Sequence, residues 1–260
     1  MGRLTKMAEE LGRLFKYRFN LFKTIGFNLK AFSFKDAIKM PVLLFGNVIL
    51  EDIHRGCIKL SVIKPDVLRI GGGRYTEMWG YSNLSKSYFR CAGTLVVGKN
   101  VIIDQGCVIS ISKNAVLTLG SNIYMNRDVK IHAKESILIE DNTRVGWSCQ
   151  IMDSNFHYCV HKGVISKRTA PVVLKHNVWL ANSVTIGKGV YLPPYFIVAA
   201  HSLVNKDFRE YEERCLIGGI PAKYITNEIT RLLNVERKLD AVFAGGKDAV
   251  NVDEVNIRIP

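Results

Sequence analysis

The chain has 260 residues, of which 48% are hydrophobic and 23% charged, and its formal net charge is +13. This composition is typical of a globular protein with a sizeable core, and no apolar run approaches the roughly 18 residues of a membrane span. The six cysteines lack the spacing of metal ligands, and the basic residues accompany no nucleic-acid motif. We therefore expect a cytoplasmic protein that needs no metal and binds no nucleic acid.

Residues 1–39 are predicted to form a basic amphipathic helix and a linker. Residues 1–40 hold nine Lys or Arg against three acids, about half of the excess positive charge. Over residues 3–23, apolar side chains recur mostly at steps of three and four, which is typical of an amphipathic helix. Two roles stay open for this helix: packing on its own or a neighbouring subunit, or peripheral contact with an anionic membrane surface at the inner face.

Residues 40–225 are predicted to form one domain of short strands. The aliphatic residues up to position 70 indicate irregular first turns of this domain. Residues 71–90 open with three consecutive glycines and are rich in aromatic side chains. We expect this segment to be a loop or hairpin that interrupts the strands.

A six-residue repeat dominates the sequence from about residue 97. Between Leu174 and Phe208 every sixth residue is aliphatic, and the residue four places later is mostly small or β-branched. A period of six fits neither a helix nor a simple strand; it is typical of a solenoid with three short strands in each turn of about 18 residues. The cysteines at positions 57, 107 and 149 each lie four residues after an aliphatic residue, where the repeat places a small side chain, so we expect buried, reduced thiols there. The repeating aliphatic residues are Leu174, Leu180, Ile186, Leu192, Val198 and Val204.

The repeat breaks after Ile151. The residues from Asp153 to His157 lead into a mixed, partly basic loop over residues 158–171 before the repeat resumes. Long loops that leave a rigid scaffold usually carry function. A neutral histidine is a natural general base near pH 7, which makes His157 a candidate. Asp153 could orient the imidazole or cap a corner of the solenoid.

These patterns resemble the hexapeptide-repeat acyltransferases, which fold as left-handed parallel β-helices, and in particular the maltose, galactoside and polysaccharide O-acetyltransferases. The resemblance covers residues 97–225. It implies an all-β solenoid that uses acetyl-CoA as acyl donor, with a sugar hydroxyl of a surface polysaccharide as acceptor. We also expect a homotrimer, because cyclic closure would bury an exposed flat face of the solenoid and the loop that follows His157. The motifs that carry the resemblance are His157 before the loop, Asn177-Val178-Trp179, Val204-Asn205-Lys206-Asp207 and Gly218-Gly219-Ile220-Pro221-Ala222-Lys223.

The resemblance also implies roles for individual residues. His157 matches the catalytic histidine, and Asn126 matches an asparagine that faces the acetyl group, although it also suits a corner turn. Lys206 and Lys223 are expected near the phosphates of the cofactor, although either could instead be an ordinary surface lysine. The residues expected along the cofactor are Trp179, Ala181, Asn182, Ala200, Asn205, Lys206 and Lys223. The sequence departs from the family at Ala181, where glycine is usual, and at His201, where a small residue is preferred.

Several alternatives stay open. An N-acetyltransferase of an amino sugar, or a serine O-acetyltransferase, would use the same fold and the same base. A zinc enzyme resembling the γ-carbonic anhydrases would need three histidines, and the spacing of His132, His157 and His161 does not match that family. A non-catalytic solenoid is the remaining alternative. Residues 226–260 are expected to form a C-terminal helix and tail.

Overall fold

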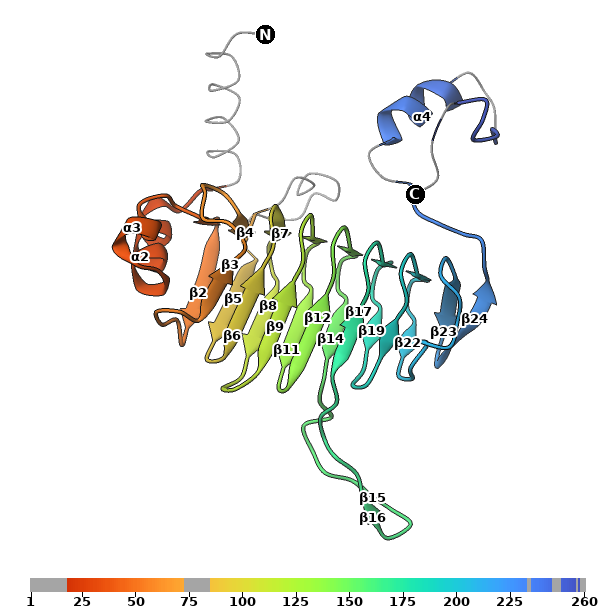
Figure 1. The fold of residues 1–260 in the computed structure, drawn as a ribbon, viewed down its shortest axis with the longest axis horizontal. Coiled ribbons are helices and arrows are strands. Elements are labelled where there is room, and N and C mark those ends of the chain that lie inside the picture. Colours follow the sequence, from red (N-terminus) through yellow and green to blue (C-terminus); the bar gives the residue numbers. More distant parts are fainter. Residues whose placement is uncertain (1–17, 73–84, 233–234, 245–248, 256, 258–260) are drawn as a thin grey trace.

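The computed structural model describes residues 18–72, 85–232, 235–244, 249–255 and 257. Most of the helix predicted over residues 3–23, and most of the insertion predicted over residues 71–90, lie outside the described residues. Within them the chain forms the predicted left-handed parallel β-helix, from Val42 to Thr226 (Figure 1).

Three sheets form the faces of the β-helix, and successive strands enter them in turn. Sheet I consists of β1 (Val42–Leu44), β4 (Leu68–Ile70), β7 (Val101–Ile103), β10 (Tyr124–Met125), β13 (Arg144–Val145), β18 (Trp179–Leu180), β21 (Ile197–Val198), β23 (Leu216–Gly219) and β24 (Ala222–Thr226). Sheet II consists of β2 (Asn47–Glu51), β5 (Lys86–Cys91), β8 (Val108–Ile111), β11 (Lys130–Ala133), β14 (Gln150–Met152), β19 (Thr185–Ile186) and β22 (Leu203–Val204). Sheet III consists of β3 (Ile58–Leu60), β6 (Thr94–Val97), β9 (Val116–Leu119), β12 (Ser136–Ile139), β17 (Val172–Leu174) and β20 (Tyr191–Leu192).

The core is a stack of like side chains inside the coil. The aliphatic residues of the six-residue repeat are fully buried, as are the thiols at positions 57, 107 and 149, which confirms both predictions. Ile131, Ile151, Ile186 and Val204 lie in register on neighbouring strands of sheet II. Each turn therefore packs mainly on the turns before and after it, as expected for a solenoid.

Asparagines form the corner between sheets III and I. Asn100, Asn122, Asn142 and Asn177 all adopt the left-handed conformation, with φ between 57° and 61°. Asparagine tolerates this region better than most residues. The side-chain amide of Asn100 donates to Asn122, and that of Asn122 donates to Asn142, both at 3.1 Å. The corner turns are thus stabilised by a ladder of side chains parallel to the solenoid axis.

The predicted insertion over residues 71–90 is too long at its C-terminal end. Lys86–Cys91 forms β5, which pairs in parallel with β2 and β8. Ser87, Phe89 and Cys91 are buried and alternate with more accessible residues. This period of two identifies a strand within an aromatic-rich segment.

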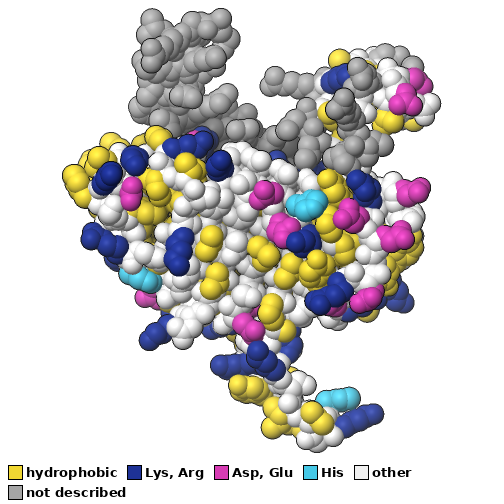
Figure 2. Space-filling view, in the orientation of Figure 1, with side chains coloured by type: hydrophobic (Ala, Val, Ile, Leu, Met, Phe, Trp, Pro, Cys, Tyr) yellow, Lys and Arg dark blue, Asp and Glu magenta, His cyan; other side chains and the backbone are white. Residues whose placement is uncertain are grey.

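Two helices cover the open end of the β-helix: α2 (Leu21–Ala31) and α3 (Phe34–Ala37). The buried Asn28 side chain donates to the carbonyl of Val42 (2.8 Å) and accepts from its N–H (3.2 Å), so it completes the hydrogen bonds of the edge strand β1. The outer side of these helices carries exposed hydrophobic side chains (Figure 2). The helix predicted over residues 3–23 is interrupted, because Arg18 has a φ of 55° and Phe19 forms a β-bridge with Phe45.

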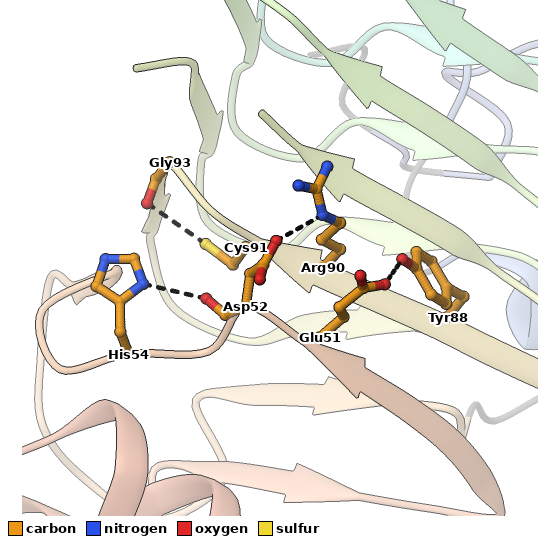
Figure 3. A network of polar contacts seen from close by, with 7 residues as sticks. All are labelled: Glu51, Asp52, His54, Tyr88, Arg90, Cys91 and Gly93. Carbon is orange, nitrogen blue, oxygen red and sulfur yellow. Dashed lines mark hydrogen bonds and ion pairs between the residues drawn. The ribbon is translucent and has the colours of Figure 1, made fainter. Parts of the chain in front are cut away.

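A polar network joins β2 to β5 near this end (Figure 3). Arg90 donates to the Asp52 carboxylate at 2.7 Å, and the Tyr88 hydroxyl donates to Glu51. The His54 ring lies 3.0 Å from the Asp52 carbonyl oxygen. The network holds two neighbouring strands in register and contains none of the predicted site residues.

Two further segments leave the coil. Residues 153–170 form an arm that projects from the β-helix and carries the hairpin β15 (Val160–His161) and β16 (Val164–Ile165) (Figure 1). The predicted C-terminal helix is present as α4 (Glu236–Phe243). None of the helices in the described ranges is long and apolar enough to cross a membrane.

Candidate active site

The residues predicted from the sequence fall on two edges of the β-helix. We call the corner between sheets I and II the Asn126 edge; its residues in register are Asn126, Gly146, Ala181, Ala199 and Gly218. We call the corner between sheets II and III the arm edge; its residues in register are Ala133, Asp153, Lys188 and Lys206. Sheet II lies between the two edges.

Asn126 lies at the corner after β10. Its backbone N–H donates to Val145 (2.9 Å), and its side-chain oxygen accepts from the N–H of Arg127 (2.8 Å). The corner-turn role left open from the sequence is therefore present. The side-chain NH₂ group makes no hydrogen bond within the described residues, so it is available to a ligand.

The Asn126 edge is smooth because small residues follow one another along it. A Cβ atom on Gly146 would lie 2.6 Å from the Ala181 carbonyl carbon, and one on Gly218 would lie 2.8 Å from the Ala199 Cβ. Neither contact is tolerable without backbone movement, so successive turns stack closely here. Asn182 and Ala200 continue the corner turns that begin at Ala181 and Ala199.

Two of the other predicted cofactor residues lie beside the same edge. Trp179 stands on the outer side of sheet I, next to the edge, and is 36% exposed. Lys223 is exposed on β24 and pairs with Gly218, at the C-terminal end of the edge. Five of the seven predicted cofactor residues therefore lie along the Asn126 edge.

The remaining two, Asn205 and Lys206, lie on the arm edge. Strand β22 separates them from Ala200. Both are exposed. The Lys206 ammonium lies 4.9 Å from the centre of the Phe208 ring and 5.8 Å from that of Tyr211. Aromatic contacts therefore hold the side chain of this lysine at the end of the coil.

The base of the arm is organised by Asp153. Its carboxylate is buried and accepts hydrogen bonds from the backbone N–H groups of Lys134 and Glu135, both at 2.8 Å. Burial raises the pKa of this carboxyl above 3.8, although the backbone hydrogen bonds oppose the shift. The Asp153 carbonyl also accepts from Ala170 (3.0 Å), which joins the two ends of the arm. Corner capping, one of the two roles considered for Asp153, is thus present, and orientation of His157 stays a prediction.

His157 is exposed at the start of the arm, where its backbone N–H donates to the Asn155 carbonyl at 2.7 Å. Its neighbour Phe156 contacts the ring of His132 edge-on, with centroids 5.8 Å apart. Burial, together with the charge of Lys134, lowers the pKa of His132 from its usual value of 6.5. His132 therefore favours the neutral form and helps to position the residue beside His157.

The histidines considered for zinc are spread over different elements. His132 lies on β11, His157 at the base of the arm and His161 on β15 of the hairpin. Among the described residues, no three His, Cys, Asp or Glu side chains form a group that could hold a metal ion. The geometry therefore gives the zinc alternative no support.

A buried polar cluster at the start of the Asn126 edge was not predicted from the sequence. Asp104 is fully buried and accepts from the Tyr124 hydroxyl (2.9 Å) and the Gln105 N–H (2.7 Å); burial raises the pKa of this carboxyl. Arg127 is 6% exposed and donates to the hydroxyl of Ser85 at 3.2 Å. The sequence signal that could have revealed this cluster was the pair of opposite charges, Asp104 and Arg127, at corners one turn apart.

Trp147 was also missed. It is 36% exposed beside Gly146, and the residues around it hydrogen-bond to the turns on both sides: Ser148 to Arg127 and Ser183 to Trp147, both at 2.9 Å. An aromatic residue at a corner otherwise occupied by small or polar residues was the signal. With Trp179 it gives the edge two accessible indole rings.

The three-stranded turns and the motif residues along their corners define the chain as a hexapeptide-repeat β-helix protein. No family model matches it. An uncharacterised 24.8 kDa protein in the cps region of Klebsiella pneumoniae is 28% identical over 149 residues, which are 57% of this chain and 65% of that protein. The alignment thus spans slightly less than two thirds of that relative's length.

Two solved structures illustrate the likeness in fold. The hexapeptide-repeat-containing acetyltransferase VCA0836 of Vibrio cholerae O1 biovar eltor, complexed with acetyl coenzyme A, is 24% identical, with a TM-score of 0.40 over 47% of this chain and 64% of that one. The polySia-specific acetyltransferase NeuO is 16% identical, with a TM-score of 0.47 over 84% of this chain and 92% of that one.

Proposed function

We propose that the chain is an acetyltransferase that moves an acetyl group from acetyl-CoA to a sugar hydroxyl during surface-polysaccharide biosynthesis in the cytoplasm. One observation carries this proposal: Asn126, the predicted cofactor residues from Trp179 to Ala200 and Lys223 follow one edge in turn. Four spacings of about 4.8 Å separate Asn126 from Gly218 along the axis, roughly 19 Å in all. Such an edge suits an extended pantetheine arm, with the acetyl group at Asn126 and the phosphates near Lys223.

A second copy of the chain is needed to complete the site. Within one chain, a strand of about five residues separates the two edges, roughly 16 Å, whereas proton transfer requires groups about 3 Å apart. The arm carries four apolar side chains that are 64–68% exposed: Tyr158, Val160, Val164 and Ile165. A cyclic homotrimer would bury them and bring each arm edge to the Asn126 edge of a neighbour.

The chemistry follows from this arrangement. His157 accepts the proton of the acceptor hydroxyl as the oxygen attacks the thioester carbonyl. The side-chain NH₂ of Asn126 is available to donate to the tetrahedral oxyanion. When the intermediate collapses, the C–S bond breaks and the imidazolium returns a proton to the departing thiolate of CoA. An amino group of an amino sugar, or a serine hydroxyl, would react through the same base.

The test combines donor turnover with analysis of the acceptor. The purified protein should bind acetyl-CoA and release CoA thiol when a glycan acceptor is present. Mass spectrometry of surface glycans from cells with and without the protein should show one acetyl group per repeat unit. Removal of that group by mild alkali would identify an ester, whereas a stable group would identify an amide and favour the N-acetyltransferase alternative. No binding of acetyl-CoA would favour a non-catalytic solenoid.

Replacing Lys223 by alanine should weaken acetyl-CoA binding more than turnover. A phosphate contact far from the thioester serves the ground state and the transition state alike, so KM rises while kcat changes little. Steady-state kinetics with varied acetyl-CoA would measure this. An unchanged KM would remove Lys223 from the donor site.

The oligomer should depend on the arm. Replacing Val160 and Ile165 together by aspartate should convert a trimer into monomers and abolish activity, because charges would enter the proposed interface. Light scattering coupled to size exclusion would report the mass. Phe34→Ser, an exposed change on α3 at the N-terminal end of the β-helix and away from the arm, serves as the control and should leave the trimer intact. A fully active monomer of the unmodified protein would contradict the shared site.

A further inference from the structure

Helix α2 is apolar on two opposite sides. Thr24, Phe27, Asn28 and Ala31 are buried against the β-helix. At about 100° per residue, Phe22, Ile25 and Leu29 follow one another along the opposite side, and Phe22 is 86% exposed. An apolar helix side is normally buried against a partner, but the outer side of α2 has no such partner among the described residues.

The neighbouring helix α3 extends this apolar surface. Phe34 is 71% exposed and Ile38, its C-cap residue, is 60% exposed. We call the five exposed apolar residues of the two helices the cap surface: Leu21, Phe22, Leu29, Phe34 and Ile38. Hydrophobic side chains gather over these helices at one end of the molecule, with Lys and Arg side chains beside them (Figure 2). A contiguous exposed patch of this kind marks an interaction site.

The charges around the cap surface are almost all positive. Residues 18–40 contain five Lys or Arg and one acid, Asp36. Asp36 pairs with Lys39 at 3.5 Å, whereas Lys30 and Lys35 make no ion pair with any described residue. Exposed aromatic and aliphatic side chains bordered by lysines are the pattern of helices that lie in the interface of an anionic bilayer.

A cleft next to the start of α2 adds a second feature. Its volume is about 400 Å³, and it lies at the N-terminal turn of α2 against the start of β2. It is lined by Arg18, Phe19, Asn20, Lys23, Gly46 and Asn47. The Lys23 ammonium already donates to the Val48 carbonyl at 3.0 Å, which holds its charge at this position. Two cations and two amide side chains form a polar recess suited to a phosphate group.

We propose that the cap surface docks on an anionic phospholipid bilayer, with Phe22, Phe34 and Ile38 entering the headgroup region and the adjacent cleft receiving a lipid phosphate. The cap covers one end of the β-helix, whereas the Asn126 edge and the arm edge run along its length (Figure 1). Docking therefore leaves both edges accessible, and the inference does not depend on the reaction that they carry out.

Vesicle sedimentation with the full chain tests this inference. The protein should bind vesicles of phosphatidylcholine containing about one third phosphatidylglycerol more tightly than phosphatidylcholine alone, and salt should weaken this binding. A Phe22→Ser/Phe34→Ser variant should bind the anionic vesicles at least roughly tenfold more weakly, because two large apolar side chains no longer leave water. Lys30→Glu/Lys35→Glu should lose the preference for anionic lipid.

Ile220→Ser provides the matched control. Ile220 is 75% exposed at the turn between β23 and β24, at the other end of the β-helix, and its substitution should leave vesicle binding unchanged. All variants should melt at the temperature of the unmodified protein, since the altered side chains are exposed. The inference fails if the unmodified protein does not bind anionic vesicles, or if the double phenylalanine variant binds them equally well. It also fails if that variant changes only the oligomeric mass, which would assign the cap surface to a second copy.

Discussion

Replacing His157 by alanine is expected to lower kcat by at least about 10²-fold, within the 10²–10⁴-fold range typical of a positioned general base. No other group of the arm edge combines the proton-accepting chemistry with the motif position. The fold should survive, because His157 is exposed and the core consists of stacked aliphatic side chains. Single-turnover kinetics and a thermal melt of the same preparation would measure both quantities.

Two asparagine variants sharpen this test. His157→Asn keeps hydrogen-bonding groups but cannot accept a proton, so it should be nearly as inactive as His157→Ala. His161→Asn changes an exposed histidine on the hairpin and should retain most of the rate. The opposite pattern, with His161→Asn inactive and His157→Asn active, would assign the base to the hairpin.

Replacing Asp153 by alanine should lower both stability and turnover. The change removes two hydrogen bonds to backbone N–H groups at the base of the arm. A loss of about 1–3 kcal/mol in the free energy of unfolding is expected, because these bonds are charge-assisted but the buried carboxylate also carries a desolvation cost. A loosened arm would displace His157, and a displacement of about 1 Å can reduce kcat by roughly 10²-fold. Chemical denaturation and steady-state kinetics would report the two effects.

The pH dependence of the Asp153 contribution has a defined sign. Burial raises the pKa of this carboxyl above 3.8 in the folded state. The folded state therefore holds this proton more tightly than the unfolded chain does. The resulting contribution to stability is fully present below pH 3.8 and is lost as the pH rises through the raised pKa of the folded state. Asp153→Asn does not titrate, so the stability of the unmodified protein relative to this variant should decrease over that range. Measuring the free energy of unfolding of both proteins across this pH range tests the prediction. A constant difference between them would contradict it.

A corner carboxylate elsewhere provides the control. Asp141 accepts a hydrogen bond from the N–H of Ser121 at 2.7 Å, at the corner between sheets III and I. Asp141→Ala should change stability only slightly, because this carboxylate is exposed, and should leave kcat unaltered.

An Asp153→Asn variant with full stability but a roughly 10²-fold lower kcat would instead assign Asp153 to orienting His157.

The sequence predicted the coil because each part of its interior is specified locally. Leu174, Leu180 and Ile186 occur six residues apart and each fills the inside of a successive strand. The period alone therefore predicted the strands, the buried positions and the direction of the side chains. The break after Ile151 likewise predicted the arm, since the six-residue pattern cannot continue through residues 153–171.

Two elements whose residues do not follow the six-residue period, β5 and α2, were missed or misplaced. β5 lies within a segment whose aromatic residues conceal its alternation. α2 buries Thr24 and Asn28 against the edge strand while Phe22 faces outward, so its apolar residues do not form a single stripe. In both cases contacts with a distant part of the chain, rather than local periodicity, decide the structure.

The sequence by itself thus determined the solenoid and the list of motif residues. Only the tertiary structure decided which of those residues lie on the Asn126 edge and which lie on the arm edge. Asn126 and Ala181 are far apart in the chain and lie on one edge, whereas Ala200 and Asn205 are close in the chain and lie on two. The physical reason is the geometry of the coil. Residues one full turn apart stack along the axis at about 4.8 Å, while residues about six apart lie on different faces.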